Sequence, residues 1–403
     1  MNSRIILDVH ALQNVPPSNI NRDDTGAPKT AVYGGVPRAR VSSQAWKRAT
    51  RMHFEKALDP SELGVRTKQL VAALAGRIAK AGEGHGLSSS DCAKLAEAML
   101  ISVIDGKKFK LEVPQRKADR TAPDDETELL KEASYLVFLS ARQLDALAGL
   151  AVEGAGDIKA FLKNKANKAR AKQVATTEHS VDIALFGRMV TDAADINVDA
   201  AAQVAHALSV HRVEIESDYF TAVDDRNSSA EPGAGMIGTV DFNSATLYRY
   251  AALDVDLLER NLGPGLDENA SPTTPVRRAL EAFLDGFVSS LPTGKINTFG
   301  NHTLPDVVVV KLRSSRPVSF VSAFEKPVTA DLDGGHMEAA CSRLVEYVPE
   351  IERAYGDENT ETWVLRVGPA TQKISGLGTE KARRTDLLDA VGTAVAARLE
   401  RRG

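Results

Sequence analysis

The chain of 403 residues has only two cysteines, Cys92 and Cys341, far apart and in no metal-ligand spacing. This pattern argues against a disulfide scaffold or a cysteine-based zinc site, and it suits a reducing cytoplasm. No run approaches the roughly 18 apolar residues of a membrane span. The N-terminus has no signal-peptide pattern either, so we expect a cytoplasmic protein.

Aromatic residues are also scarce, at 5% of the chain. A surface of Phe and Tyr that stacks bases is therefore poorly supported, and the consensus RNP1 motif is absent. The sequence contains no Walker A motif, no G-x-G-x-x-G after a strand and no G-x-S-x-G. An enzyme would be expected to leave more trace than this, so we expect neither catalytic activity nor a cofactor.

Positive charge is concentrated in one place, although the formal net charge is -4. The segment 29–51, KTAVYGGVPRARVSSQAWKRATR, has no Asp or Glu. It contains the basic residues Lys29, Arg38, Arg40, Lys47, Arg48 and Arg51. Such a local inversion of charge marks an anion site.

The pattern within this segment predicts a strand followed by a helix. Residues 36–42 alternate, which is typical of a half-buried strand, and Ser42 and Ser43 offer an N-cap hydroxyl. No Gly or Pro interrupts the next residues until Pro60, which predicts about four helical turns. The spacing i, i+3, i+4 and i+7 puts four polar or basic side chains on one helix face. They are Gln44, Lys47, Arg48 and Arg51.

The opposite face of this helix is expected to pack on a sheet through Trp46, Ala49, His53 and Ala57. The basic face, the Ser-Ser cap and the helix N-terminus would then meet where a phosphate chain could lie. Contacts of this type position a backbone and read no sequence. The alternative is that the basic face is only solvated surface.

The rest of the chain predicts an α+β fold. Strands are expected at 4–12, 239–250 and 307–312, and the four consecutive valines of the last suit a strand buried on both faces. A helix is expected at 275–291. The region from about 60 to 178 is rich in Ala, Leu and Lys and predicts a helical insertion. Its expected helices are at 67–81, 88–104, 124–150 and 157–174.

This order of elements is compatible with a ferredoxin-like or RNA-recognition-like sheet. The segment 211–238 contains a Gly/Ser/Pro-rich run and predicts an extended, projecting hairpin. Residues 263–275 predict a second loop.

Acidic residues in two places allow a metal site as an alternative. Asp218, Asp224 and Asp225, with His206 and His211 upstream, could bind a divalent ion for phosphodiester cleavage. Their spacing matches no known ligand set, which favours a solvated acidic loop. The stretch 21–26, NRDDTG, lacks the later ligands of a calcium loop and predicts an Asx-rich turn.

A second basic cluster lies on the helical stretch near 157–174. It is either a solvated face or a weaker, separate polyanion contact. Its members are Lys159, Lys163, Lys165, Lys168, Arg170 and Lys172.

Several short motifs follow one another along the chain, beginning with NINRDD, VYGG and RARVSSQAWKRATR near the N-terminus. They continue through VDIALFGRM at 181–189, DYFTAVDD at 218–225, LYRY at 247–250 and AFEKPV at 323–328. Together these motifs closely resemble the CasC family, the backbone subunits of the type I-E CRISPR Cascade surveillance complex. Their order and spacing over roughly residues 4–330 make the resemblance specific.

The resemblance implies an RNA-recognition-like palm, a large helical finger insertion and a thumb β-hairpin. The palm would be discontinuous, at 1–59 and 180–403, with the finger domain at 60–179 and the thumb at about 210–238. About six copies would stack head to tail along a guide RNA (crRNA), with the thumb displacing one nucleotide in six.

The resemblance also implies roles for individual residues. The strand-to-helix element would bind the RNA backbone, helped by the preceding loop, and Met189 would pack at the RNA kink. Finger lysines would contact target DNA. The RNA-binding set is Arg22, Lys29, Ser42, Gln44, Lys47, Arg48, Arg51 and Met189, and the DNA-binding set is Lys159, Lys163 and Lys168.

The partners implied by the resemblance are crRNA, target DNA, other copies of the chain, the large subunit CasA, the small subunit CasB, the cap subunit CasD and the crRNA-processing ribonuclease CasE. No bond-making step and no membrane is expected. Two alternatives stay open. One is a metal-dependent ribonuclease like the backbone subunits of type III complexes, and the other is a single-strand RNA-binding protein that works alone.

Overall fold

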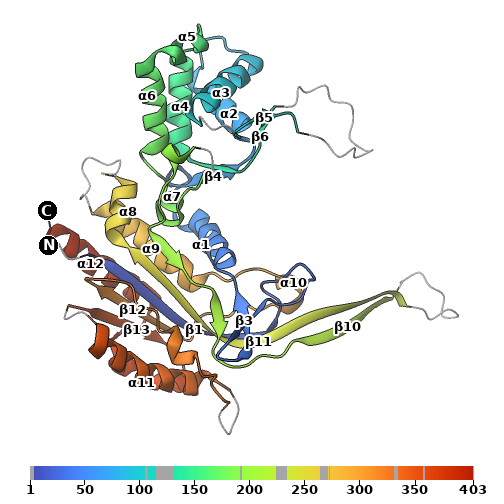
Figure 1. Cartoon of the computed structure of the whole chain (residues 1–403), viewed down its shortest axis with the longest axis vertical. Coiled ribbons are helices and arrows are strands. Elements are labelled where there is room, and N and C mark those ends of the chain that lie inside the picture. The colour runs from blue at the N-terminus through green and yellow to red at the C-terminus, as the bar shows by residue number, and fades with distance from the viewer. Residues whose placement is uncertain are drawn as a thin grey trace. The chain divides into compact units, whose positions relative to one another are not determined.

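The computed structural model describes residues 4–104, 108–114, 130–190, 193–223, 234–263, 271, 273–330, 335–356 and 359–402. The chain forms two compact units of mixed α+β structure, coloured along the sequence in Figure 1. Unit 1 comprises Met1–Lys56, Ala202–Asp256 and Arg277–Gly403. Unit 2 comprises Ala57–Ala201 and Leu257–Val276.

Unit 1 is built on a sheet with the strand order β14-β13-β12-β1-β11-β9-β3-β2, to which β8 and β10 add through β11. The described pairings are antiparallel except that of β13 with β14. The strands are β1 (Ile6–Ser18), β2 (Thr30–Tyr33), β3 (Val36–Val41), β8 (Ala202–Val204), β9 (Ala207–Ser209), β10 (Glu216–Val223), β11 (Ala234–Asp254), β12 (Val307–Arg313), β13 (Glu361–Arg366) and β14 (Thr379–Glu380).

Strand β1 lies at the centre, between β11 and β12. It continues to Ser18, past the expected end at 12, because Val15 still pairs with Ala245 of the long strand β11. All seven residues of β12 are buried, which confirms the prediction of a strand covered on both faces.

The helices of unit 1 cover both faces of this sheet. They are α1 (Ser43–Ala57), α9 (Thr274–Ser289), α10 (Ile296–Phe299), α11 (Met337–Tyr355) and α12 (Arg384–Glu400), with the 3-10 turns η3 (Val321–Phe324) and η4 (Pro369–Leu377). Alternation along β11 sets the two faces. Tyr248 belongs to the core under α11, whereas Leu247 belongs to the core with Trp46 of α1.

Unit 2 is mainly helical, as expected of the insertion, with two short β-pairs. Its elements are η1 (Pro60–Glu62), β4 (Gly64–Thr67), α2 (Leu70–Ala81), α3 (Ser89–Val103), β5 (Leu111–Glu112), β6 (Glu132–Ala133), β7 (Val137–Ser140), α4 (Ala141–Glu153), α5 (Ile158–Lys163), α6 (Lys165–Thr176), α7 (Val181–Phe186) and η2 (Ala194–Ile196). Helix α8 (Val255–Leu262) runs into this unit from unit 1.

Two helix predictions in unit 2 are wrong in detail. The expected helix at 124–150 is replaced from 132 onward by β6, β7 and then α4, because Ser140 forms a capping box with Gln143 that starts the helix there. The expected helix at 157–174 is two helices. Asn164 ends α5 and its side chain caps α6 by accepting from the Ala166 N–H at 2.9 Å.

Unit 2 continues past residue 179, the expected end of the finger domain, to Ala201. Arg188 holds this extension in place. Its buried guanidinium donates to the carbonyls of Phe138, Ala175 and Ile196. Within the described residues, no helix is long and apolar enough to cross a membrane.

Candidate nucleic-acid interface

The junction of β3 and α1 is fixed by hydrogen bonds on both sides of Ser42. The Asn21 Oδ1 accepts from the Ser42 N–H at 2.8 Å. The Ser42 hydroxyl in turn accepts from the Ala45 N–H at 3.3 Å, as expected of an N-cap. Ser42 is only 7% exposed, so its side chain sets where the helix begins and offers little surface of its own.

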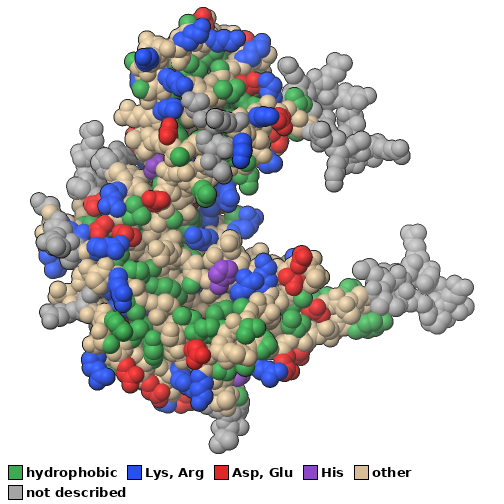
Figure 2. All heavy atoms as spheres, viewed as in Figure 1, with side chains coloured by type: hydrophobic (Ala, Val, Ile, Leu, Met, Phe, Trp, Pro, Cys, Tyr) green, Lys and Arg blue, Asp and Glu red, His purple; other side chains and the backbone are tan. Residues whose placement is uncertain are grey.

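Helix α1 presents its basic side chains away from the core. Gln44 and Arg48 are exposed, and Lys47 and Arg51 are half-buried. Burial lowers the pKa of Lys47, since desolvation disfavours the charged amine. Figure 2 shows Lys and Arg side chains gathered over this helix, which gives the face its cationic character.

The core-facing stripe of α1 differs from the prediction. Trp46, Thr50 and Phe54 are buried, whereas Ala57 is exposed and His53 is half-buried. Trp46 is buried as expected, but the stripe continues through Thr50 and Phe54 because α9 and β11 pack against that side of the helix. The Arg249 guanidinium of β11 lies 3.7 Å from the Trp46 ring and 4.6 Å from the Phe287 ring of α9.

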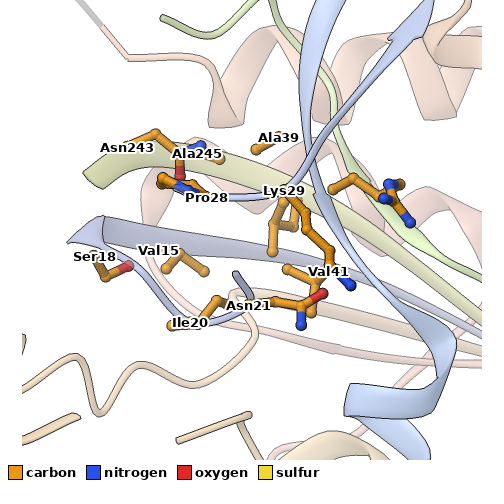
Figure 3. A pocket seen from close by; sticks show the side chains of 12 residues that line it. Val15, Ser18, Ile20, Asn21, Pro28, Lys29, Ala39, Val41, Asn243 and Ala245 are labelled. Atoms are coloured by element: carbon orange, nitrogen blue, oxygen red, sulfur yellow. The ribbon is translucent and has the colours of Figure 1, made fainter. Parts of the chain in front are cut away.

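The loop before β2 brings Arg22 and Lys29 to the same part of unit 1. Arg22 forms an isolated bridge with Pro28, and the Lys29 N–H donates to the Asn21 carbonyl at 2.9 Å. The Asp23 carboxylate accepts from Thr25 and Ala27, so the acidic stretch is an Asx turn, as predicted. Figure 3 shows Lys29 beside Asn21 and Val41 in the small pocket at this junction.

The remaining predicted residues lie in unit 2. Met189 is 85% exposed although it follows the buried Arg188. Gly187, with φ of +77°, turns the chain just before them, and the Asn197 side chain accepts from the Val190 N–H at 2.6 Å. A large apolar side chain is thus displayed on a well-tethered loop, although a single exposed hydrophobic residue is common on a protein surface.

The finger lysines are divided by the break at Asn164. Lys159 and Lys163 are exposed on α5, and Lys168 is half-buried on α6. Arg170 and Lys172 pair with Glu153 and Asp195 at 3.0 and 3.3 Å. The acidic partners reduce the net charge of α6, which also carries Lys165 and Lys168, beside Lys159 and Lys163 on α5.

The predicted projecting hairpin is formed by β10 and β11, paired from Glu216 with Phe242 onward. Tyr219 is 61% exposed on it, an aromatic residue that the composition argument did not single out. Asp224 and Asp225 of the metal alternative lie outside the described residues. Within the described part of the chain, no group of three His, Cys, Asp or Glu side chains could hold a metal ion.

At the base of this hairpin, His211 predicts a dependence of stability on pH. Burial lowers its pKa to about 4, and its Nε2 accepts from the Thr246 N–H at 3.1 Å. The unfolded chain binds the proton first, so its contribution is complete above about pH 6.5 and is lost as pH falls toward 4. We expect the free energy of unfolding to drop by on the order of 1–2 kcal/mol from pH 7 to 5 through this group.

Denaturant titrations followed by tryptophan fluorescence would measure this drop, because Trp46 and Trp363 both lie in unit 1. The His211→Gln variant should lose less stability on acidification than the original chain. The exposed His302 gives the matched control, and His302→Gln should leave the pH dependence unchanged. Equal pH dependence in all three proteins would contradict the prediction.

The chain is similar to known proteins along most of its length. The model of a family described as "CT1975-like protein" matches residues 7–391. A chain of a solved structure described as "CRISPR RNA-guided surveillance complex, pre-nicking" is 33% identical, with a TM-score of 0.80 over 96% of this chain and 99% of that one. A chain of another, described as "CRISPR RNA-guided surveillance complex", is 30% identical, with a TM-score of 0.68 and the same coverage. None of the curated proteins compared matches the sequence.

Proposed function

Because this chain belongs to the CT1975-like protein family, we propose that it is a crRNA-binding backbone subunit of a CRISPR surveillance complex. The main observation behind this proposal is the cationic face of α1 beside the Arg22 to Lys29 loop. The chain that bears it is similar along nearly its whole length to chains of such complexes. More specifically, we propose that the complex is a type I-E Cascade and that the chain is its CasC subunit.

In this proposal the RNA backbone follows the surface from the loop to α1. Arg22, Lys29, Lys47, Arg48 and Arg51 neutralise phosphates, and Gln44 donates a neutral hydrogen bond. Such contacts hold a single strand without reading its sequence. Ser42 acts mainly by fixing the start of α1, since its hydroxyl is a helix cap.

In this proposal the two units and the hairpin have different roles in binding. The run β12-β1-β11-β9, with α1 and α9 in its connections, has the strand order of a ferredoxin-like palm. Unit 2 would be the finger domain, where Lys159, Lys163 and Lys168 contact target DNA. The hairpin of β10 and β11 would be the thumb. Met189 would pack against bases at each kink of the guide.

The mechanism requires no bond-making step. Each copy would hold about six nucleotides of guide with their bases free for pairing, and Watson-Crick pairing would read the target. A head-to-tail contact that does not close into a ring builds a helical filament. Its length must be limited by the partners, which we propose to be CasA, CasB, CasD and CasE.

The first test is the nucleic acid that co-purifies after co-expression with the partner subunits and a CRISPR array. We expect one RNA species of uniform length, protected from nuclease except at positions about six nucleotides apart. A heterogeneous mixture of cellular RNA would instead indicate an RNA-binding protein that works alone.

The same complex separates the non-catalytic role from a ribonuclease. Complementary labelled RNA incubated with Mg²⁺ should stay intact. Cleavage at six-nucleotide intervals that disappears in Asp225→Ala would overturn the non-catalytic assignment and favour the metal-dependent enzyme.

A further inference from the structure

A further group of basic side chains lies on β3 and in the segments just before β2 and β9, outside the residues assigned above to α1. Arg40 of β3 pairs with Leu208 of β9, which places Arg40 near His206, the residue just before that strand. The Arg40 guanidinium lies 3.4 Å from the His206 Nδ1. Its Nε donates to the Thr30 carbonyl at 3.1 Å, which holds the guanidinium in one direction.

Lys29 completes the group from the loop before β2. The Arg40 N–H donates to the Lys29 carbonyl at 2.9 Å, so the two residues are held side by side. Both line the small pocket at the junction shown in Figure 3. His206 is exposed, and Lys29 and Arg40 are half-buried. Across the part of the chain that the structure describes, no carboxylate forms an ion pair with any of the three.

The cluster is unusual because like charges are brought together without an acid. Holding the Lys29 and Arg40 cations side by side, next to the neutral His206 ring, is unfavourable in the free protein. An anion bound between them would relieve the repulsion. Arg40 offers a planar fork of donors suited to phosphate oxygens, and Lys29 offers a compact charge.

We propose that Arg40 and His206, together with Lys29, bind a phosphate of the guide RNA at a site additional to the α1 face. The inference rests on the proposed function and extends its binding surface from α1 across β3 to β9. His206 would be the pH-sensitive member of the site.

The protonation state of His206 should make RNA binding at this site depend on pH. In the neutral ring Nδ1 accepts from Arg40, so the proton lies on Nε2, which can donate to a ligand. Burial lowers the pKa of His206, and the charges of Arg40 and Lys29 lower it further. Among the residues that the structure describes, these two are the charged groups that act on the ring. A bound phosphate supplies the opposite charge and favours the imidazolium, in which Nδ1 also carries a proton. Nδ1 can then no longer accept from Arg40, so in the bound state the Arg40 guanidinium would donate to the phosphate instead. RNA binding should therefore take up a proton and tighten as pH falls.

The experiment measures the affinity of the purified chain for a fluorescent single-stranded RNA of guide length at pH 6 and pH 8. Arg40→Ala should weaken binding about tenfold at 50 mM salt, the effect of one lost phosphate contact. In the original chain, binding should be several-fold tighter at pH 6. His206→Gln keeps a polar side chain of similar reach and should remove most of this pH effect. Arg353→Ala, an exposed residue of α11, controls for the loss of one charge.

The outcomes separate this inference from the proposed function. RNA binding that is weakened by Lys47→Ala with Arg51→Ala, but not by Arg40→Ala or His206→Gln, would overturn the inference alone. Absence of RNA binding by the original chain would overturn both. His206→Gln leaves β3 intact, so loss of its pH effect supports the site even if Arg40→Ala fails to fold.

Discussion

The double variant Lys47→Ala with Arg51→Ala is expected to bind single-stranded RNA about sixtyfold more weakly than the original chain at 50 mM salt. Each phosphate contact to a single strand contributes a salt slope of roughly -0.7, so two lost contacts make the slope shallower by about 1.4. The deficit should therefore shrink to about tenfold at 200 mM salt. Filter-binding titrations at several salt concentrations would measure both the affinity and the slope.

A matched double variant controls for net charge. Arg353 and Arg401 are exposed on unit 1, in α11 and after α12, outside the proposed RNA path. Arg353→Ala with Arg401→Ala removes the same charge and should change the affinity less than about twofold, since distant surface charges are screened. Unchanged RNA loading by the α1 variant would contradict the assignment of this face.

The sequence predicted the elements around the site because their signals are local. Alternation in 36–42, the serines at the junction and the uninterrupted helix that follows are each a property of a few neighbouring residues. The structure has β3 at Val36–Val41 and α1 at Ser43–Ala57, close to these expectations. The buried run of β12 was predictable for the same reason.

The sequence could not predict which basic side chains are buried. Arg38 and Arg40 are two residues apart on β3 and looked equivalent. Arg38 is fully buried and Arg40 is not, because the chain near residue 324 lies over one of them and not the other. The group formed by Arg40, Lys29 and His206 was missed for a similar reason, since it joins positions more than 160 residues apart.

Burial also explains why the motifs VYGG and AFEKPV stabilise the fold and do not bind a ligand directly. In VYGG the turn residue Gly34 has φ of +60°, and its Cα packs against the Glu325 carbonyl of AFEKPV. A side chain there would clash with that carbonyl. The two motifs therefore belong to one packing arrangement that holds the β2–β3 hairpin, and with it the strand leading into α1.

Arg38→Met is expected to lower the free energy of unfolding of unit 1 by about 3–4 kcal/mol, because it leaves buried carbonyls without a donor. The guanidinium now donates to the Ser209, Phe324 and Glu325 carbonyls at 2.8, 2.9 and 3.1 Å, which ties β3 to β9 and η3. Denaturant titrations followed by tryptophan fluorescence would measure the loss. Arg48→Met removes an exposed arginine and should weaken RNA binding while changing stability by less than about 0.5 kcal/mol. Equal stability of the two variants would show that Arg38 does not hold the hairpin, and the RNA-binding surface would then need another support.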